Sequence, residues 1–86
     1  MAADKKSQQA VCSRVARILR LERERRNLSM NVVAARAGLS QQMVSYVERE
    51  MRNPTLETVL RISAAIEVDP LELLRRALQR DGKAGK

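Results

Sequence analysis

The sequence predicts an all-α domain of five helices, and three observations support this prediction. Apolar residues recur three and four positions apart along the chain, which is the spacing of an amphipathic helix. Ser29, Ser40, Thr55 and Asp69 each precede such a stretch, in the position of a helix N-cap. No β-branched run alternates with polar residues as a strand would.

The first helix is predicted from about Ser7 to about Arg25. Asn27 suits its C-terminal end, because Asn tolerates the left-handed conformation found there. The charged run over residues 20–26 is expected to be a solvated helix end. The apolar stripe of this helix comprises Val11, Val15, Ile18 and Leu19.

The second and third helices are predicted from Met30 to about Ala37 and from Gln41 to about Arg49. Only three residues separate them, and Gly38 permits a sharp turn. Two short helices joined by a tight turn that contains Gly make a helix-turn-helix unit. The predicted seam between them comprises Val33, Ala34, Ala37, Leu39, Val44 and Val47.

The last two helices follow a turn at Asn53-Pro54. The fourth opens after the Thr55 cap and is expected to supply the core with Leu56, Val59, Leu60 and residues 62–66. The fifth opens at Asp69-Pro70-Leu71-Glu72, which combines a cap, a Pro at the first helical position and a Glu three residues after the cap.

Length and composition limit the chain's organisation and chemistry. With 86 residues it makes one domain, predicted over residues 7–80, between flexible tails at 1–6 and 81–86. Its net charge of +7 and pI near 10.8 favour a polyanionic partner such as nucleic acid. There is no His and one Cys, so we expect no metal, no cofactor and no catalytic residue, and the chain is not predicted to be an enzyme.

The cellular location follows from similar reasoning. Cys12 has no partner for a disulfide, which suits a reducing compartment. No signal peptide and no apolar stretch of about 20 residues is present, so we expect a cytoplasmic protein that does not enter a membrane.

The third helix carries the candidate DNA-reading face. When the apolar residues of the predicted seam face the second helix, the remaining residues of the third helix fall on one outward side. Gln pairs with adenine through two hydrogen bonds, and Ser and Tyr reach base edges or phosphates. The alternative without a DNA-binding role is that Gln and Ser are ordinary solvent-facing residues of a surface helix. The predicted base-reading residues are Gln41, Gln42, Ser45 and Tyr46, and the predicted phosphate contacts are Ser29, Arg49, Arg52 and Asn53.

The motifs Ala37-Gly38-Leu39-Ser40, Val47-Glu48-Arg49 and residues 52–57 resemble the Cro/C1-type (XRE-like) helix-turn-helix regulators, which include the lambdoid phage repressors. The resemblance covers residues 11–74 and implies a lambda-repressor-like DNA-binding domain. It implies base contacts by Gln41, Gln42 and Tyr46, and an ion pair between Arg23 and Glu48. The residues assigned structural roles are Arg23, Ala34, Gly38, Val44, Val47 and Glu48.

The sequence departs from this family at Glu50, where a Gly is usual. A non-Gly residue in a left-handed conformation is strained, and a carboxylate near DNA is unfavourable.

The expected function is sequence-specific regulation of transcription as a repressor, by a homodimer on double-stranded DNA. The candidate dimer interface is the fifth helix, through Leu71, Leu73, Leu74 and Leu78; alternatively Leu71, Leu74 and Leu78 cover the core while Leu73 is exposed. A second hypothesis is an antitoxin-like or regulatory module that binds a protein partner.

Overall fold

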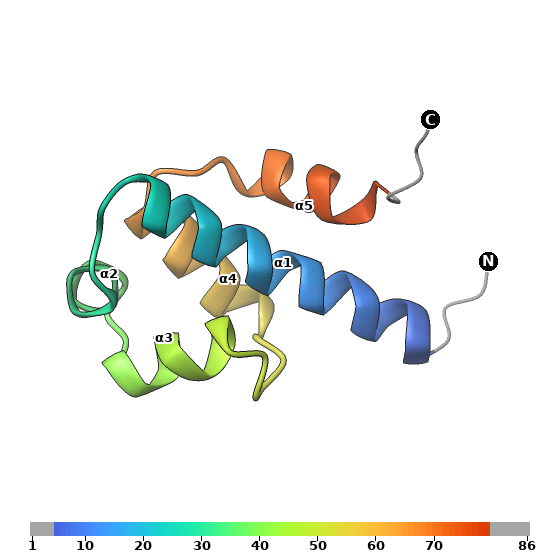
Figure 1. Cartoon of the computed structure of the whole chain (residues 1–86), viewed down its shortest axis with the longest axis horizontal. Helices are drawn as coiled ribbons and strands as arrows, with labels where there is room; N and C mark the ends of the chain where they lie inside the picture. Colours follow the sequence, from blue (N-terminus) through green and yellow to red (C-terminus); the bar gives the residue numbers. More distant parts are fainter. Residues whose placement is uncertain (1–4, 80–86) are drawn as a thin grey trace.

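A computed structural model describes residues 5–79 and contains helices without strands over that range. The helices are α1 (Lys5–Arg25), α2 (Met30–Ala37), α3 (Gln41–Glu48), α4 (Leu56–Ala65) and α5 (Pro70–Leu78). In Figure 1, α1 runs across the middle of the molecule, with α5 along one side and α3 along the other. The predicted five-helix architecture is therefore confirmed.

Helix α1 begins two residues earlier than the sequence predicted. Lys5 and Lys6 are helical rather than part of a tail, while residues 1–4 and 80–86 lie outside the described part of the chain. Helices α2 to α5 begin directly after the predicted N-cap residues. The side chains of Ser29, Ser40, Thr55 and Asp69 each accept a hydrogen bond from a backbone N–H of the following turn.

The hydrophobic core lies where all five helices meet. Its largest side chains exposed by less than 2% are Leu19, Val33, Val44, Val47, Ile62, Ile66 and Leu73, together with the hydroxyl-bearing Ser63. Small residues complete it, with Ala16 on α1 and Ala34 and Ala37 on α2. Small side chains let neighbouring helix axes approach closely, as the predicted seam requires.

Two leucines of α4 are not in the core, contrary to the prediction. Leu56 is 65% exposed and Leu60 is 44% exposed. The buried positions of α4 begin at Val59 and continue at Ile62 and Ser63, which are three and four residues further on. Leu56 and Leu60 are four residues apart on a different face of the same helix, so burying the first face leaves theirs in solvent.

The register of α5 also differs from both alternatives considered for it. Leu73 is fully buried and Ala77 is buried, whereas Leu71 is 77% exposed and Leu78 is 60% exposed. The prediction that Leu73 contributes to a dimer interface is therefore wrong, as is the alternative in which Leu73 faces solvent. Arg14 donates from Nε to the carbonyl oxygen of Ala77 over 2.6 Å, which fixes this rotation of α5 against α1.

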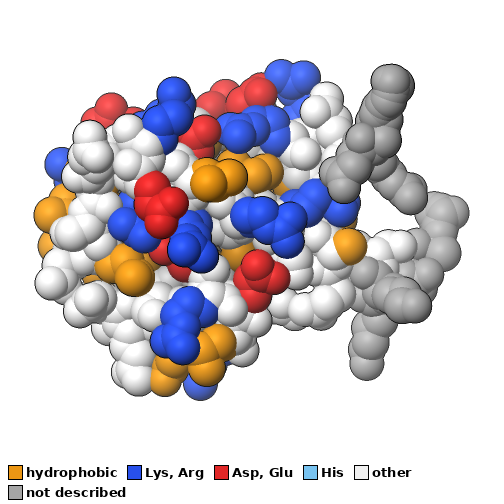
Figure 2. All heavy atoms as spheres, viewed as in Figure 1, with side chains coloured by type: hydrophobic (Ala, Val, Ile, Leu, Met, Phe, Trp, Pro, Cys, Tyr) orange, Lys and Arg blue, Asp and Glu red, His pale blue; other side chains and the backbone are white. Residues whose placement is uncertain are grey.

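The charged end of α1 is not simply solvated, because Glu22 is buried there. Its carboxylate accepts hydrogen bonds from Arg25 and Arg26 on α1 and from Arg76 on α5. These contacts, that of Arg25 being the strongest, lower the pKa of Glu22 from 4.5 to about 2. Figure 2 shows acidic and basic side chains interleaved on this side of the molecule. Glu22 therefore joins α1 to α5, whereas Arg20, Glu24 and Arg25 of the same run are exposed, as expected.

Candidate nucleic-acid interface

The turn between α2 and α3 sets the angle of the helix-turn-helix unit. Gly38 has φ of 70°, and its successor Leu39 donates from its backbone N to the carbonyl oxygen of Ala34 over 2.9 Å. A Cβ on Gly38 would lie 3.0 Å from Nη1 of Arg61, which reaches the turn from α4. Gly38 is therefore favoured by its left-handed backbone conformation, and a Cβ there would in addition make the end of the Arg61 side chain shift.

Helix α3 places its apolar face inward and its polar face outward. Ser40 accepts from the backbone N of Met43 over 3.0 Å and starts the helix. Val44 and Val47 are fully buried. The single acidic residue of α3, Glu48, is also buried, so the outward face of α3 carries no carboxylate.

The predicted base-reading residues lie on this outward face. Gln41 and Gln42 are exposed at the start of α3, and Ser45 and Tyr46 are half-buried one turn later. Gln42 donates from Nε2 to the hydroxyl of Tyr46 over 2.7 Å. The guanidinium carbon of Arg52 lies 5.4 Å from the centre of the Tyr46 ring, which is a cation–π distance.

The predicted phosphate-contacting residues fall into two groups. Ser29 lies at the N-terminus of α2, where its Oγ accepts from the backbone N of Val32 over 3.1 Å. Arg49, Arg52 and Asn53 lie in and beside the loop that follows α3, and all three are exposed.

Sequence reasoning missed the residue that holds this loop to α1. The amides of Gln9 and Asn53 exchange two hydrogen bonds, with Gln9 Nε2 donating over 3.0 Å and Asn53 Nδ2 donating over 3.3 Å. The two residues are 44 positions apart, and although Asn53 belongs to a predicted turn, no local motif pairs it with Gln9. The amide of Asn53 is thus partly used within the protein.

Arg23 and Glu48 form the ion pair that the family resemblance implies. Arg23 donates from Nε and Nη2 to the two carboxylate oxygens of Glu48, over 2.7 and 3.0 Å. Its Nη1 also donates to the carbonyl oxygen of Leu28 over 2.7 Å. The hydrogen bond with Glu48 raises the pKa of Arg23 above its ordinary value. The guanidinium group of Arg23 therefore ties α1 both to the C-terminal end of α3 and to the loop before α2.

Glu50 adopts the left-handed conformation that the sequence pattern predicts for this position, with φ of 61°. Glu67, for which no left-handed conformation was predicted, has the same φ of 61° in the turn between α4 and α5. Both side chains are exposed.

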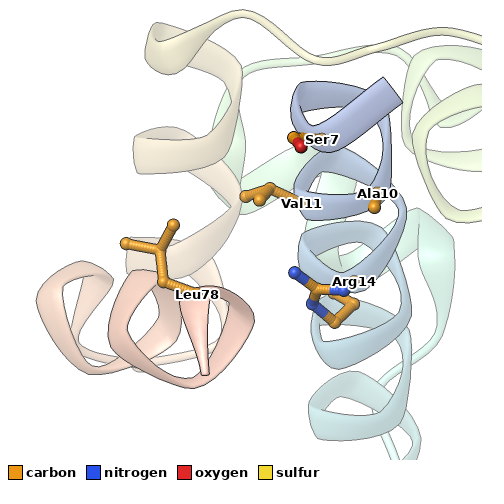
Figure 3. Close-up of a pocket in the computed structure, with 5 residues that line it drawn as sticks. All are labelled: Ser7, Ala10, Val11, Arg14 and Leu78. Carbon is orange, nitrogen blue, oxygen red and sulfur yellow. The ribbon is translucent and has the colours of Figure 1, made fainter. Parts of the chain in front are cut away.

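A second surface feature lies away from α3, between the first half of α1 and the end of α5. Figure 3 shows Leu78 of α5 facing Val11 of α1 across a hollow of about 240 Å³. Arg14, Ala10 and Ser7 complete its lining.

Within the described part of the chain, no three His, Cys, Asp or Glu side chains gather as metal ligands would. Among residues 5–79, no helix is long and apolar enough to cross a membrane.

Comparison with known proteins supports this interpretation of the fold. A family profile described as "Helix-turn-helix" matches residues 19–73, which is more than half of the chain. The chain is 37% identical over 60 residues to the HTH-type transcriptional regulator SlrR of Bacillus subtilis, covering 69% of this chain and 40% of SlrR. It is 44% identical over 55 residues to an uncharacterised HTH-type transcriptional regulator, y4dJ of Sinorhizobium fredii, covering 64% of this chain and 70% of that protein.

Two solved structures resemble the fold. The restriction-modification controller protein C.AhdI from Aeromonas hydrophila superposes with a TM-score of 0.67 and 32% identity, over 72% of this chain and 94% of that one. A mutant of the restriction-modification controller protein C.Esp1396I gives a TM-score of 0.74 at 20% identity, over 79% of this chain and 88% of that one.

Proposed function

This chain belongs to the helix-turn-helix family of DNA-binding transcriptional regulators, and from that premise we propose that it recognises a specific double-stranded sequence by placing α3 in the major groove. Gln41, Gln42, Ser45 and Tyr46 then read base edges. Since the family is one of DNA-binding regulators, the role we assign to α3 is recognition and not catalysis.

One observation carries the proposal: the outward face of α3 is polar, uncharged at its start and free of carboxylates. Glu48 is turned into the protein and neutralised by Arg23, so it does not repel the phosphates. Two Gln side chains, each with a donor and an acceptor, remain exposed at the end of the helix that enters the groove first.

The phosphates on either side are contacted from two positions. The N-terminus of α2, with Ser29 at its cap, presents backbone N–H groups and the positive end of the helix dipole. On the other side of α3, Arg49 and Arg52 supply full charges and Asn53 an amide. These contacts fix the position of the protein on the duplex without reading sequence.

The regulatory effect that we propose is repression, because a protein seated in the major groove excludes other proteins from the same stretch of DNA. One such module buries little surface, so useful specificity calls for two copies on half-sites about 34 Å apart.

We propose that the second copy docks on α5. Leu71, Leu74 and Leu78 are three and four residues apart and share one face, and the two outer ones are largely exposed. The double variant L71Q/L78Q should sediment as a monomer at concentrations where the unmodified protein sediments as a dimer. L56Q, which changes an equally exposed leucine on α4, serves as the control and should leave the dimer intact. A monomer for the unmodified protein at all concentrations would contradict the dimer.

The DNA proposal is tested by selecting binding sites from a randomised duplex pool at near-physiological salt. We expect enrichment of an inverted repeat whose half-site centres are about one helical turn apart. In the same experiment, Q42A should lose preference at one position per half-site, while Q79A, which removes an exposed Gln beyond α5, should select the unchanged motif.

Binding without any enrichment, weakening steeply as salt rises, would mean that the net charge alone attracts DNA. The protein-interaction function would then become the better account of this fold.

A further inference from the structure

We propose that Tyr46 is a specificity-determining residue that makes Gln42 accept adenine and reject guanine. This inference rests on the proposed function and adds the base preference of the site, together with the side chain that imposes it.

The contact that carries the inference joins two side chains on one face of α3. Gln42 and Tyr46 are four residues apart, and Nε2 of Gln42 donates to the Tyr46 hydroxyl over 2.7 Å. Gln42 is exposed, so the remainder of its amide is free to meet a base. One of the two amide hydrogens is therefore already committed before DNA arrives.

The tyrosine whose hydroxyl accepts this hydrogen bond is itself held in place. Tyr46 is half-buried, and the Arg52 guanidinium lies over its ring. Arg52 stays close because its neighbour Met51 donates from its backbone N to the carbonyl oxygen of Tyr46 over 2.9 Å. The phenol is thus positioned from the loop side, and the orientation of the Gln42 amide follows from the position of the phenol.

The groups left on Gln42 match one purine and not the other. With one N–H donated to Tyr46, the amide retains one N–H and the acceptor oxygen Oε1. Adenine presents one acceptor, N7, and one donor, the N6 amino group, so both of its groups can be satisfied. Guanine presents two acceptors, N7 and O6, and needs two donors from the same amide.

Binding guanine therefore costs the Gln42 amide a hydrogen bond or a favourable contact that binding adenine does not. To give each guanine acceptor its own hydrogen bond, the amide must release Tyr46 and turn both hydrogens to the base. Otherwise its one remaining N–H is all that N7 and O6 can receive, or Oε1 faces O6 and two acceptors oppose each other. A well-made two-bond contact is worth about 5- to 150-fold in discrimination against the wrong base. We expect a preference for adenine in that range at the position read by Gln42.

The experiment starts from the selected binding site, and Q42A locates the position that Gln42 reads. Equilibrium binding is then measured on two duplexes that differ only by adenine or guanine at that position. Four proteins are compared, namely the unmodified chain, Y46F, Q42A and the double variant. Y46F keeps the ring beneath Arg52 and removes only the hydroxyl, and its folding is checked by circular dichroism and urea denaturation.

We expect the unmodified protein to prefer adenine, and Y46F to lose several-fold of that preference chiefly by binding guanine more tightly. In the Q42A background the same Tyr change should leave the ratio of the two affinities unaltered, because the amide through which Tyr46 acts is gone.

Three results would overturn the inference. A preference of the unmodified protein for guanine would mean that both amide hydrogens face the DNA. An unchanged ratio in Y46F would mean that the hydroxyl does not orient the amide. An equal effect of Y46F with and without Gln42 would mean that Tyr46 acts on the base at this position directly and not through Gln42. Failure to select any sequence at all would instead reject the proposed function, so the two failures are distinguishable.

Discussion

Arg61 of α4 donates from Nη1 to the carbonyl oxygen of Ala37, the last residue of α2, over 3.1 Å. Arg36 of α2 returns the contact, donating from Nη1 to the carbonyl oxygen of Ala65, the last residue of α4, over 3.2 Å. Each helix thus provides the cation that caps the C-terminus of the other, where unpaired carbonyls and the helix dipole favour positive charge. Glu57 orients the first of these arginines by accepting from its Nε and Nη2.

Arg61→Met should destabilise the fold by about 1–2 kcal/mol, because it leaves a part-buried carbonyl without its charged donor. Arg17→Met removes the same charge from an exposed position of α1 and should change stability by less than about 0.5 kcal/mol. Urea denaturation of the two variants measures the difference. Equal stability would show that water replaces the Arg61 contact at no cost.

The buried pair of Arg23 and Glu48 should behave as one unit. Glu48→Met leaves a guanidinium group that is only 12% exposed without its carboxylate, at a cost of about 3–5 kcal/mol. The double variant R23M/E48M should recover a large part of that loss, since no uncompensated charge remains. A double-mutant cycle from urea denaturation gives the coupling energy, and additive losses would mean that the two groups act independently.

Acid should weaken the junction of α1 and α5 through Glu22. The pKa of Glu22 is lowered from 4.5 to about 2 in the folded protein, so the unfolded chain takes up its proton first. The stabilisation is therefore complete above about pH 5 and is lost as pH falls from there toward 2.

Glu22→Gln should flatten the dependence of unfolding free energy on pH in that range, and should cost about 1–3 kcal/mol at neutral pH. Glu67→Gln, at an exposed turn, should leave the slope intact. The measurement is urea denaturation at a series of pH values. A slope in E22Q as steep as in the unmodified protein would assign acid sensitivity to other carboxylates.

Glu50→Gly should raise both stability and DNA affinity. A left-handed conformation costs a non-Gly residue about 1–2 kcal/mol, part of which the greater freedom of Gly in the unfolded chain offsets, leaving a gain of about 0.5–1 kcal/mol. The change also removes a carboxylate next to the residues assigned to phosphate.

Glu67→Gly is a matched control, with the same φ of 61° and the same change in charge but a position between α4 and α5. It should gain similar stability without tighter DNA binding. If both variants bind DNA equally more tightly, the effect belongs to net charge and not to the position of Glu50.

Local sequence signals predicted most of the fold. Each cap acts on its own first turn, so Ser29, Ser40, Thr55 and Asp69 could be recognised without knowing what the helices pack against. The outward direction of Gln41 and Gln42 followed from the apolar seam of the same helix.

The rotation of α5 could not be predicted in this way, because leucines occupy more than one of its faces. Its choice of Leu73 depends on contacts with α1, made by Arg14 with Ala77 and by Glu22 with Arg76. The contact of Gln9 with Asn53 and the reciprocal caps of α2 and α4 escaped prediction for the same reason. These contacts, together with that of Arg14 with Ala77, join residues 24 to 63 positions apart. They form only when the helices have packed together.

The arrangement of donors around Glu22 also bears on the order in which the chain folds. Arg25 and Arg26 are three and four residues from Glu22 and can reach it as soon as that turn of α1 forms, whereas Arg76 is 54 residues away. Local contacts of this kind form long before distant ones, because they require little loop closure. We therefore expect α1 to present an oriented carboxylate, already partly neutralised, while α5 is still separate. Helix α5 then docks against a carboxylate that α1 has already oriented. Only the ion pair between Glu22 and Arg76 has to form across the long separation in sequence.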